Sequence, residues 1–422
     1  MAVIMANMIG TGVFTSLGFQ LADIQSGFVL IMLWVVGGLT ALCGALTYAE
    51  LGAALPRSGG EYNFLNEIYH PAAGFISGWI SATIGFAAPT ALAGITFGTY
   101  LASVFPSLSP TWLACGLVLA LTAAHASTRR SSGGVQRVLT VIKVLLILGF
   151  CVLSWILVDV PQKVSFLPSA ADGPLLASGA FAVSLIYVNY AYTGWNAATY
   201  ITGELERPQE NLSRILLVGT GVVVLLYVLL NFTFLYVAPM DAMVGKLEIG
   251  YVSAQYAFGA SGAAIMGVVL ALLLISTVSA MILAGPRVLQ VIGQDFIAFR
   301  WLAKQNADGV PAVAIAVQSI LTLGFILSAS FESILVFAGF TLGLNTFFTV
   351  LGVFVLRWRR PDLPRPYRTV WYPLPPLVFL SVTGWTLTYI LMERPVEGLW
   401  GLAIVGSGGV FYLLTRWVGG RI

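Results

Sequence analysis

Charged side chains are scarce in this chain of 422 residues: only 9% are Asp, Glu, Lys or Arg, whereas a soluble protein usually carries about 25%. Histidine occurs twice and cysteine three times, and Cys43, Cys115 and Cys151 lie in separate apolar runs without metal-like spacing. A nucleotide-binding loop of the GxxxxGK type is also missing. These absences exclude an ordinary soluble domain, and they give no support to a metal centre or to an ATP-driven machine.

Apolar residues make up 58% of the chain, and glycine occurs 45 times. A membrane-spanning helix needs about 20 mostly apolar residues, so runs of this length predict an all-α integral membrane protein with twelve transmembrane helices. The expected spans cover residues 1–20, 28–55, 71–104, 110–127, 134–158, 175–203, 213–238, 260–287, 311–328, 332–357, 371–392 and 397–418. The stretches 239–259 and 288–310 are expected to be longer loops. No charged segment precedes the first run, so we expect no signal peptide, and we expect the natural chain to begin before Met1.

Two of these spans contain segments that favour a break in the helix. The first span carries Ile-Gly-Thr-Gly-Val at 9–13, and the sixth carries Tyr-Ala-Tyr-Thr-Gly-Trp at 190–195. Lipid does not satisfy free backbone N–H and C=O groups, so unwound backbone at this depth is tolerated only where it lines a cavity or is buried in protein. Broken spans at matching places in the two halves of a membrane protein indicate the binding site of a transporter.

Basic residues predict how the spans are oriented, because cytoplasmic loops are rich in Lys and Arg. With the N-terminus inside, sixteen of the 20 Lys and Arg fall in cytoplasmic segments and three fall outside, at Lys163, Lys246 and Arg394. We therefore expect both termini to be cytoplasmic, with the protein in a plasma or inner membrane.

Four segments carry a family resemblance. They are 8–14, around the first break; 48–51 with 56–62, at the end of the second span; 190–196 with 203–212, around and after the second break; and 285–287, at the end of the eighth span. In these segments the chain resembles the amino acid–polyamine–organocation superfamily of permeases, close to its L-type amino acid transporter branch. The resemblance covers the whole chain and implies a leucine-transporter-type fold, in which an inverted repeat of five plus five spans is followed by two further spans. We expect a single polytopic transporter domain over 1–422, with repeat one at 1–158, repeat two at 175–357 and the extra spans at 371–418.

The two breaks suit a zwitterionic amino acid. The helix that restarts near Gly12 exposes free N–H groups to a carboxylate, and free carbonyls near Met8 and at 189–191 accept bonds from an ammonium. The expected substrate-binding residues are Ile9, Gly10, Thr11, Gly12, Asn189, Tyr190, Ala191, Tyr192 and Thr193. The resemblance makes Tyr190 an aromatic gate over the substrate. The alternatives are that Tyr190 is a packing aromatic and that Gly10 and Gly12 only bring helices together, although a spacing of two fits such packing poorly.

Lys143 is the one basic residue placed in the interior of an expected span, away from its ends. Such a charge costs about 2.5–3.5 kcal/mol at mid-membrane, and it usually faces the bundle interior and marks function. The resemblance implies that its ammonium takes the sodium position of sodium-coupled relatives, where it would hold the first break and contact Ser276, Thr277 or Ser279 of the eighth span. Transport would then be independent of sodium, with proton coupling left open. The alternative is that Lys143 reaches the lipid headgroups, since Arg137 precedes it by only six residues.

The acidic residues near the second span receive structural interpretations. We expect Glu50 to anchor the loop that follows this span, and Glu61 and Glu67 to be solvated or paired with Arg57 in that loop. No acidic residue and no arginine is then placed securely at the pocket, which favours neutral amino acids over cationic or acidic ones.

The sequence therefore predicts a secondary active transporter of neutral amino acids that works by alternating access, as an exchanger, a uniporter or a proton-coupled permease. A sodium-coupled symporter of the same fold and a permease for cationic amino acids or polyamines remain the alternatives. We expect no catalytic residues, no cofactor and no metal, because no aspartate lies securely in mid-span and His70 and His125 are far apart. The expected partners are the substrate and the lipid bilayer, without nucleic acid. The loop 105–109 contains no cysteine, so no disulfide-linked partner is expected.

Overall fold

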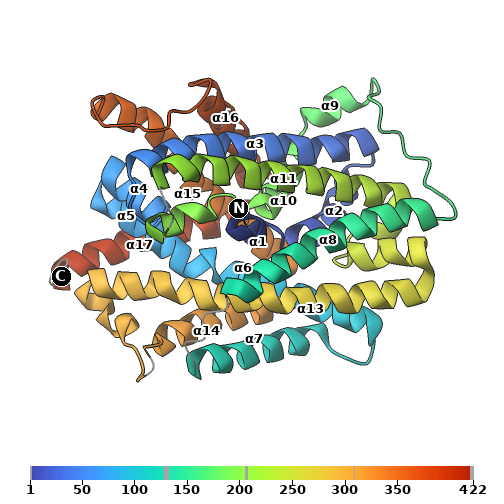
Figure 1. Ribbon diagram of the computed structural model, residues 1–422, viewed down its shortest axis with the longest axis horizontal. Helices are drawn as coiled ribbons and strands as arrows, with labels where there is room; N and C mark the ends of the chain where they lie inside the picture. Colours follow the sequence, from blue (N-terminus) through green and yellow to red (C-terminus); the bar gives the residue numbers. More distant parts are fainter. Residues whose placement is uncertain (1, 128–132, 205–207, 308, 419–422) are drawn as a thin grey trace.

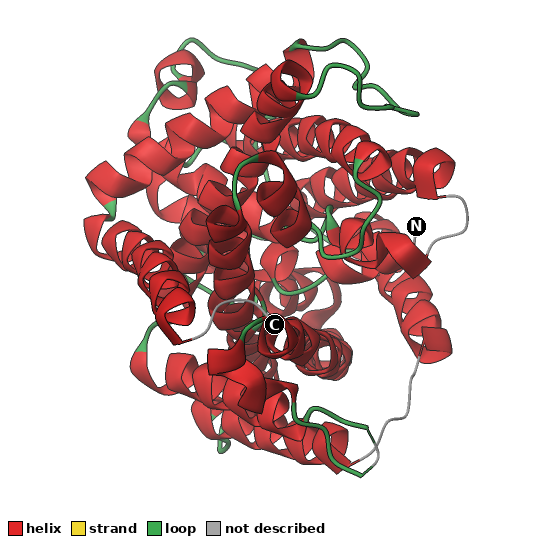
Figure 2. Cartoon of the chain, turned by 90° about the vertical axis from the view of Figure 1, so that its left-hand side faces the viewer, coloured by secondary structure: helices red, strands yellow, loops and turns green. Residues whose placement is uncertain are grey.

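The computed structural model describes residues 2–127, 133–204, 208–307 and 309–418. These residues form helices and connecting turns without a strand, and most helices run along the long axis of the molecule (Figures 1 and 2). The first half contains α1 (Ala2–Met8), α2 (Gly12–Asp23), α3 (Gly27–Ala54), α4 (Glu61–Ile68), α5 (Pro71–Ile80), a π-helical turn η1 (Ser81–Gly85), α6 (Ala87–Val104), α7 (Pro110–Ser127), α8 (Gly133–Leu157) and α9 (Asp172–Leu176). The second half contains α10 (Gly179–Tyr192), a 3-10 helix η2 (Ala197–Glu204), α11 (Pro208–Val237), α12 (Met240–Met243), α13 (Ile249–Asp295), a 3-10 helix η3 (Ile297–Ala303), α14 (Ala312–Ser328), α15 (Phe331–Arg359), α16 (Leu374–Glu393) and α17 (Pro395–Val418).

The outer surface of the bundle is apolar. Nine helical segments of the described residues are long and apolar enough to cross a membrane, and α14 is apolar but shorter. On α8, Val138, Val141 and Leu145 are exposed, whereas Lys143 on the same helix is 5% exposed. This distribution is the reverse of a soluble protein's, so the chain is an all-helical, multi-pass membrane protein whose solvent is largely lipid.

The two ends of the bundle differ in what they carry. In Figure 1, α4 and α5 lie at the left end and α9 lies at the right end, and we call these the α4 end and the α9 end. Helix α3 joins them: its N-cap residue Ser26 donates to the Asp172 carboxylate of α9, at 2.6 Å, and its last turn leads to α4. Figure 2 looks onto the α4 end. Helix α17 ends at this end of the molecule, whereas α1 lies near the middle of the long axis in Figure 1.

Helix α13 reaches further at both of its ends than the sequence predicts. The stretch 239–259 is not a plain loop, because α13 begins at Ile249 and bends at Gly259, where φ is 70°. Pro286 does not end this helix either, because the chain stays helical to Asp295. Leu289 and Ile292 explain the extension, since they bury their side chains in an apolar cluster with Phe75.

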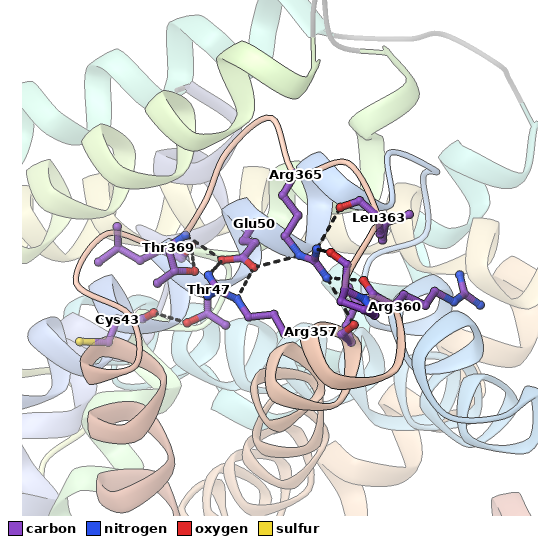
Figure 3. Close-up of polar contacts among 11 residues, drawn as sticks. Cys43, Thr47, Glu50, Arg357, Arg360, Leu363, Arg365 and Thr369 are labelled. Atoms are coloured by element: carbon purple, nitrogen blue, oxygen red, sulfur yellow. Dashed lines mark hydrogen bonds and ion pairs between the residues drawn. The ribbon is translucent and has the colours of Figure 1, made fainter.

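A buried ion pair fastens α3 to the last turn of α15 and to the segment that follows it (Figure 3). The Glu50 carboxylate accepts from Arg357 Nε and Nη2 at 2.8 and 2.7 Å, and from the backbone N–H of Thr369 at 2.7 Å. Arg365 Nε lies 3.6 Å from the same carboxylate. The Nη1 of this arginine donates to the Leu363 carbonyl of its own loop at 2.9 Å. The expectation that Glu50 anchors the loop after the second span is therefore wrong, because its partners come from the α15–α16 segment instead.

Candidate substrate site

The two predicted breaks meet inside the bundle. Helix α1 ends at Met8 and α2 begins at Gly12, while α10 ends at Tyr192 and the chain turns through Gly194, whose φ of 106° excludes a continuing helix. A Cβ added to Gly12 would lie 2.5 Å from Ala191 Cα, so the breaks are in backbone contact at this point. After the second break the chain forms a 3-10 helix rather than an α-helix.

A cavity of ≈ 180 Å³ borders both breaks. Eight of the nine residues expected to bind substrate line it: Gly10, Thr11, Gly12, Asn189, Tyr190, Ala191, Tyr192 and Thr193. Ile9 instead lines a separate cavity of ≈ 20 Å³, together with Lys143 and Thr277. The backbone thus divides the first break between two compartments.

Backbone donors at the start of α2 are open. Thr11 occupies the N-cap position of α2 and makes no side-chain capping bond. The first N–H groups of a helix have no hydrogen-bond acceptor within the helix, and here no N-cap side chain supplies one. Thr11 and Gly12 line the cavity, so these N–H groups supply positive charge at its wall.

Several carbonyls near the breaks already have protein partners. The Tyr227 hydroxyl lies 2.5 Å from the Met8 carbonyl and 3.2 Å from the Ala191 carbonyl, so it bridges the two breaks. The Asn189 carbonyl accepts from Thr193 Oγ1 at 3.2 Å. Tyr227 is fully buried in α11, and nothing in the sequence around it marked it for this place.

Lys143 reaches the first break from α8. Its Nζ donates to the Ile9 carbonyl and to Thr277 Oγ1, at 3.0 Å each. The alternative in which Lys143 extends to the headgroups is wrong, because the side chain is 5% exposed and points into the bundle. The other two hydroxyls named from the sequence lie elsewhere: Ser276 donates to the Leu273 carbonyl of its own helix, and Ser279 bonds His125.

The tyrosines of α10 have different surroundings. Tyr190 is 7% exposed, lines the cavity and packs in a cluster with Ile84 and Leu335. The Tyr192 hydroxyl donates to the Trp34 carbonyl of α3 at 3.0 Å, so its polar end is committed to the packing of α10 on α3.

Aromatic rings close the bundle one turn beyond Tyr190, toward the α9 end. Phe19 of α2 stacks on Tyr187 at 5.5 Å between ring centroids and on Phe331 of α15 at 5.8 Å. The Tyr187 hydroxyl donates to Glu332 Oε1 at 2.7 Å, and Arg394 bonds the same oxygen at 2.5 Å. Three stacked rings backed by an ion pair therefore lie beyond the cavity toward the α9 end, although none of the three lines the cavity.

Glu61 lies at the opposite side of the cavity. It is 1% exposed, lines the cavity and accepts hydrogen bonds from the side chains of Tyr48, Asn196 and Tyr200. Two expectations are therefore wrong: Glu61 is not a solvated loop residue, and the cavity does have an acidic residue in its wall. Glu67, on the same helix, is only partly buried, with its side chain 38% exposed, and it pairs with Arg360 at 3.6 Å.

An irregular turn in the third span, which the sequence analysis missed, also borders the cavity. The π-helical turn η1 ends at Gly85, and Ser81, Gly85 and Pro89 line the cavity. Pro89 has no N–H, so it removes the α-helical partner of the Gly85 carbonyl four residues earlier. Turns of this type occur often at functional sites, and Pro89 was the signal in the sequence.

These features define the class of protein as a multi-pass membrane transporter. Its helices span the membrane, two unwound segments border one cavity, and the Lys143 ammonium is bonded to the first unwound segment. The profile of the amino acid permease family matches residues 1–408, so the chain belongs to this family, and the resemblance predicted from the four segments is confirmed. The chain is 28% identical over 425 residues to the human large neutral amino acids transporter small subunit 2, covering 98% of this chain and 79% of that protein. It is 26% identical over 420 residues to the mouse b(0,+)-type amino acid transporter 1, covering 98% of this chain and 85% of that protein. The chain is accordingly an amino acid permease and not an enzyme.

Proposed function

We propose that this permease is a sodium-independent transporter of neutral amino acids that binds the substrate backbone at its two unwound segments. The observation that carries the proposal is the uncapped start of α2 on the wall of a cavity that the end of α10 also borders. A carboxylate at the N–H groups of Gly12 and Val13 gains up to about 2 kcal/mol from the helix dipole when partly buried. Several such contacts fit the roughly 4–8 kcal/mol of binding that suits a substrate which must also be released.

The substrate ammonium has its acceptors at the end of α10. The last carbonyls of a helix lack intrahelical partners, and a carbonyl oxygen that already accepts one bond keeps a second lone pair. The Asn189 and Ala191 carbonyls are in this position, since each accepts one protein hydroxyl. The carboxylate and the ammonium of one amino acid would thus bridge the two breaks.

Sodium independence follows from the placement of Lys143. Its ammonium already bonds a backbone carbonyl of the first break and a hydroxyl of α13, which are oxygen ligands of the kind a sodium ion takes. Two cations so close together would repel each other, so the lysine excludes the ion. A sodium-coupled symporter would need Lys143 to leave this position.

A neutral substrate fits the charges of the cavity. Glu61 is the acidic residue in the wall, and three neutral donors already occupy its carboxylate. The name of one relative points the same way, since it is called a large neutral amino acids transporter. A permease for cationic amino acids or polyamines would need a carboxylate open to the substrate.

We propose twelve spans for the whole chain. Nine helical segments and α14 supply ten, and the broken pairs α1–α2 and α10–η2 supply the first and the sixth. Residues 1–158 and 175–357 would form the inverted repeats of one domain, followed by the extra spans at 371–418. The α4 end carries Arg357, Arg359 and Arg365, so it would face the cytoplasm, and both termini would lie on that side.

Alternating access then follows from the closures on the two sides of the cavity. The aromatic stack of Phe19, Tyr187 and Phe331 would close the outward side. Substrate would enter from outside when this stack opens and leave past η2 on the cytoplasmic side. Exchange, uniport and proton-coupled transport share this cycle.

Counterflow in proteoliposomes tests the proposal. Vesicles loaded with one unlabelled amino acid are placed in a trace of the same labelled amino acid, over a panel of neutral, cationic and acidic amino acids and putrescine. We expect accumulation for neutral amino acids and the same rate after choline replaces sodium. Strict dependence on sodium, or accumulation confined to cationic amino acids and putrescine, would overturn the proposal, and protein-free vesicles are the control.

A further inference from the structure

Glu61 joins four elements at the α4 side of the cavity. It is the first residue of α4, and its carboxylate accepts from Tyr48 Oη of α3 at 3.0 Å, from Asn196 Nδ2 in the second break and from Tyr200 Oη of η2. The residue before it donates its backbone N–H to the Thr199 carbonyl of η2 at 3.3 Å. No described Lys or Arg forms an ion pair with Glu61.

Glu61 acts through its neighbours rather than on the substrate. Its side chain is 1% exposed, although it lies in the cavity wall, whereas Asn196 keeps 8% of its surface there. An ionised carboxylate only accepts hydrogen bonds. Each group that faces Glu61 must therefore turn a donor toward it.

This requirement fixes the orientation of the Asn196 amide. The amide can present either its NH₂ group or its oxygen to a neighbour, and the carboxylate selects the NH₂ group. The oxygen Oδ1 is left on the other side, and no donor to it exists among the described residues. Asn196 lines the cavity, so the surface that it keeps there carries a hydrogen-bond acceptor.

We propose that Glu61 is a positioning residue that makes Asn196 an acceptor for the substrate side chain, so that the permease selects neutral amino acids with an O–H or N–H donor over apolar ones of equal size. This inference rests on the proposed function. The aromatic stack lies toward the α9 end, and the carboxylate and ammonium of the substrate occupy the breaks. The cavity continues from the breaks to Asn196 and Tyr200, so this is the space for the side chain.

Threonine and valine form the matched pair for the test, because they have the same shape and differ by a hydroxyl in place of a methyl group. The readout is the ratio of kcat/KM for threonine to that for valine in counterflow. This ratio does not depend on the amount of folded protein, and the cost of dehydrating the hydroxyl is common to all variants. Glu61→Gln keeps the shape but offers both a donor and an acceptor, so the Asn196 amide is no longer held in one orientation.

We expect the ratio to fall about three- to tenfold in Asn196→Leu, which removes the acceptor, and to fall in the same direction in Glu61→Gln. Glu61→Asp, which remains acceptor-only, should recover part of the ratio. Glu67→Gln on the same helix is the control, because Glu67 does not line the cavity, and it should leave the ratio unchanged. An unchanged ratio in a folded Glu61→Gln protein would show that Glu61 does not position the amide. If Glu61→Gln does not fold, Asn196→Leu still tests whether the acceptor contacts the substrate side chain.

One result in Asn196→Leu would overturn the inference while leaving the proposed function intact, namely an unchanged ratio of kcat/KM for threonine to that for valine. If kcat/KM falls equally for both amino acids, so that the ratio is unchanged, the acceptor contacts the substrate backbone instead. Failure of the wild-type protein to transport any amino acid would instead remove the proposed function itself.

Discussion

Replacing Lys143 by methionine removes an ammonium but keeps an unbranched side chain in the same space. Two charge-assisted hydrogen bonds of 3.0 Å are lost, to the Ile9 carbonyl and to Thr277 Oγ1. Each is worth about 1.5–3 kcal/mol. The desolvation penalty of the buried charge, several kcal/mol, is recovered at the same time. We therefore expect the free energy of unfolding to change by less than about 2 kcal/mol.

The recovered desolvation penalty does not restore the geometry of the first break. The Ile9 carbonyl is fixed by the Lys143 ammonium, and without it the free energy that holds the unwound segment falls by about 1.5–3 kcal/mol. Since every 1.4 kcal/mol is a factor of ten, kcat/KM should fall about 10- to 100-fold. The protein should stay folded and inactive, which separates a role in the site from a role in stability.

The assay is counterflow in proteoliposomes, with the thermal unfolding midpoint measured on the same preparations. Lys163→Met is the control, because Lys163 is exposed in a connecting segment. Each protein is measured in sodium and in choline. Unchanged transport in Lys143→Met, with unchanged ion dependence, would refute the assignment of Lys143 to the site.

Two further substitutions test the packing on which the site depends. In Gly12→Ala the new Cβ would lie 2.5 Å from Ala191 Cα, so the two breaks must separate and the transport rate should fall at least tenfold. Gly221→Ala is the control and should transport normally, because a Cβ at this position meets no atom within 4 Å. Equal transport rates of the two variants would contradict close contact of the breaks. Glu50→Gln leaves arginines without their buried partner and should lower the free energy of unfolding by about 3 kcal/mol. Glu67→Gln, in a partly exposed pair, should cost less than about 1 kcal/mol, and similar unfolding midpoints for these two variants would show that the Glu50 pair does not hold the α4 end together.

Regular apolar spans and the breaks could be predicted from local sequence. The runs 28–55 and 110–127 correspond to α3 at Gly27–Ala54 and α7 at Pro110–Ser127, because an uninterrupted apolar run has one stable conformation in lipid. The breaks could be predicted because glycine pairs and mixed aromatic segments are poor helix formers at that depth.

Tertiary contacts explain what could not be predicted. Glu61 is buried because its carboxylate bonds Tyr48 and Asn196, and Asn196 follows it by 135 residues in the sequence. The polar loop sequence around Glu61 does not indicate a contact with so distant a residue. The continuation of α13 past Pro286 likewise depends on an apolar cluster shared with Phe75. The contact of Lys143 with the first break was implied by the family resemblance, whereas its sequence position alone left two alternatives open.

A structure of the permease with a bound neutral amino acid tests the central claim most directly. The distance to measure runs from the substrate carboxylate to the backbone nitrogens of Gly12 and Val13. The account predicts that these atoms lie about 3 Å apart, with the ammonium at the end of α10. A carboxylate bound by an arginine or lysine side chain, or a substrate outside the cavity between the breaks, would contradict it.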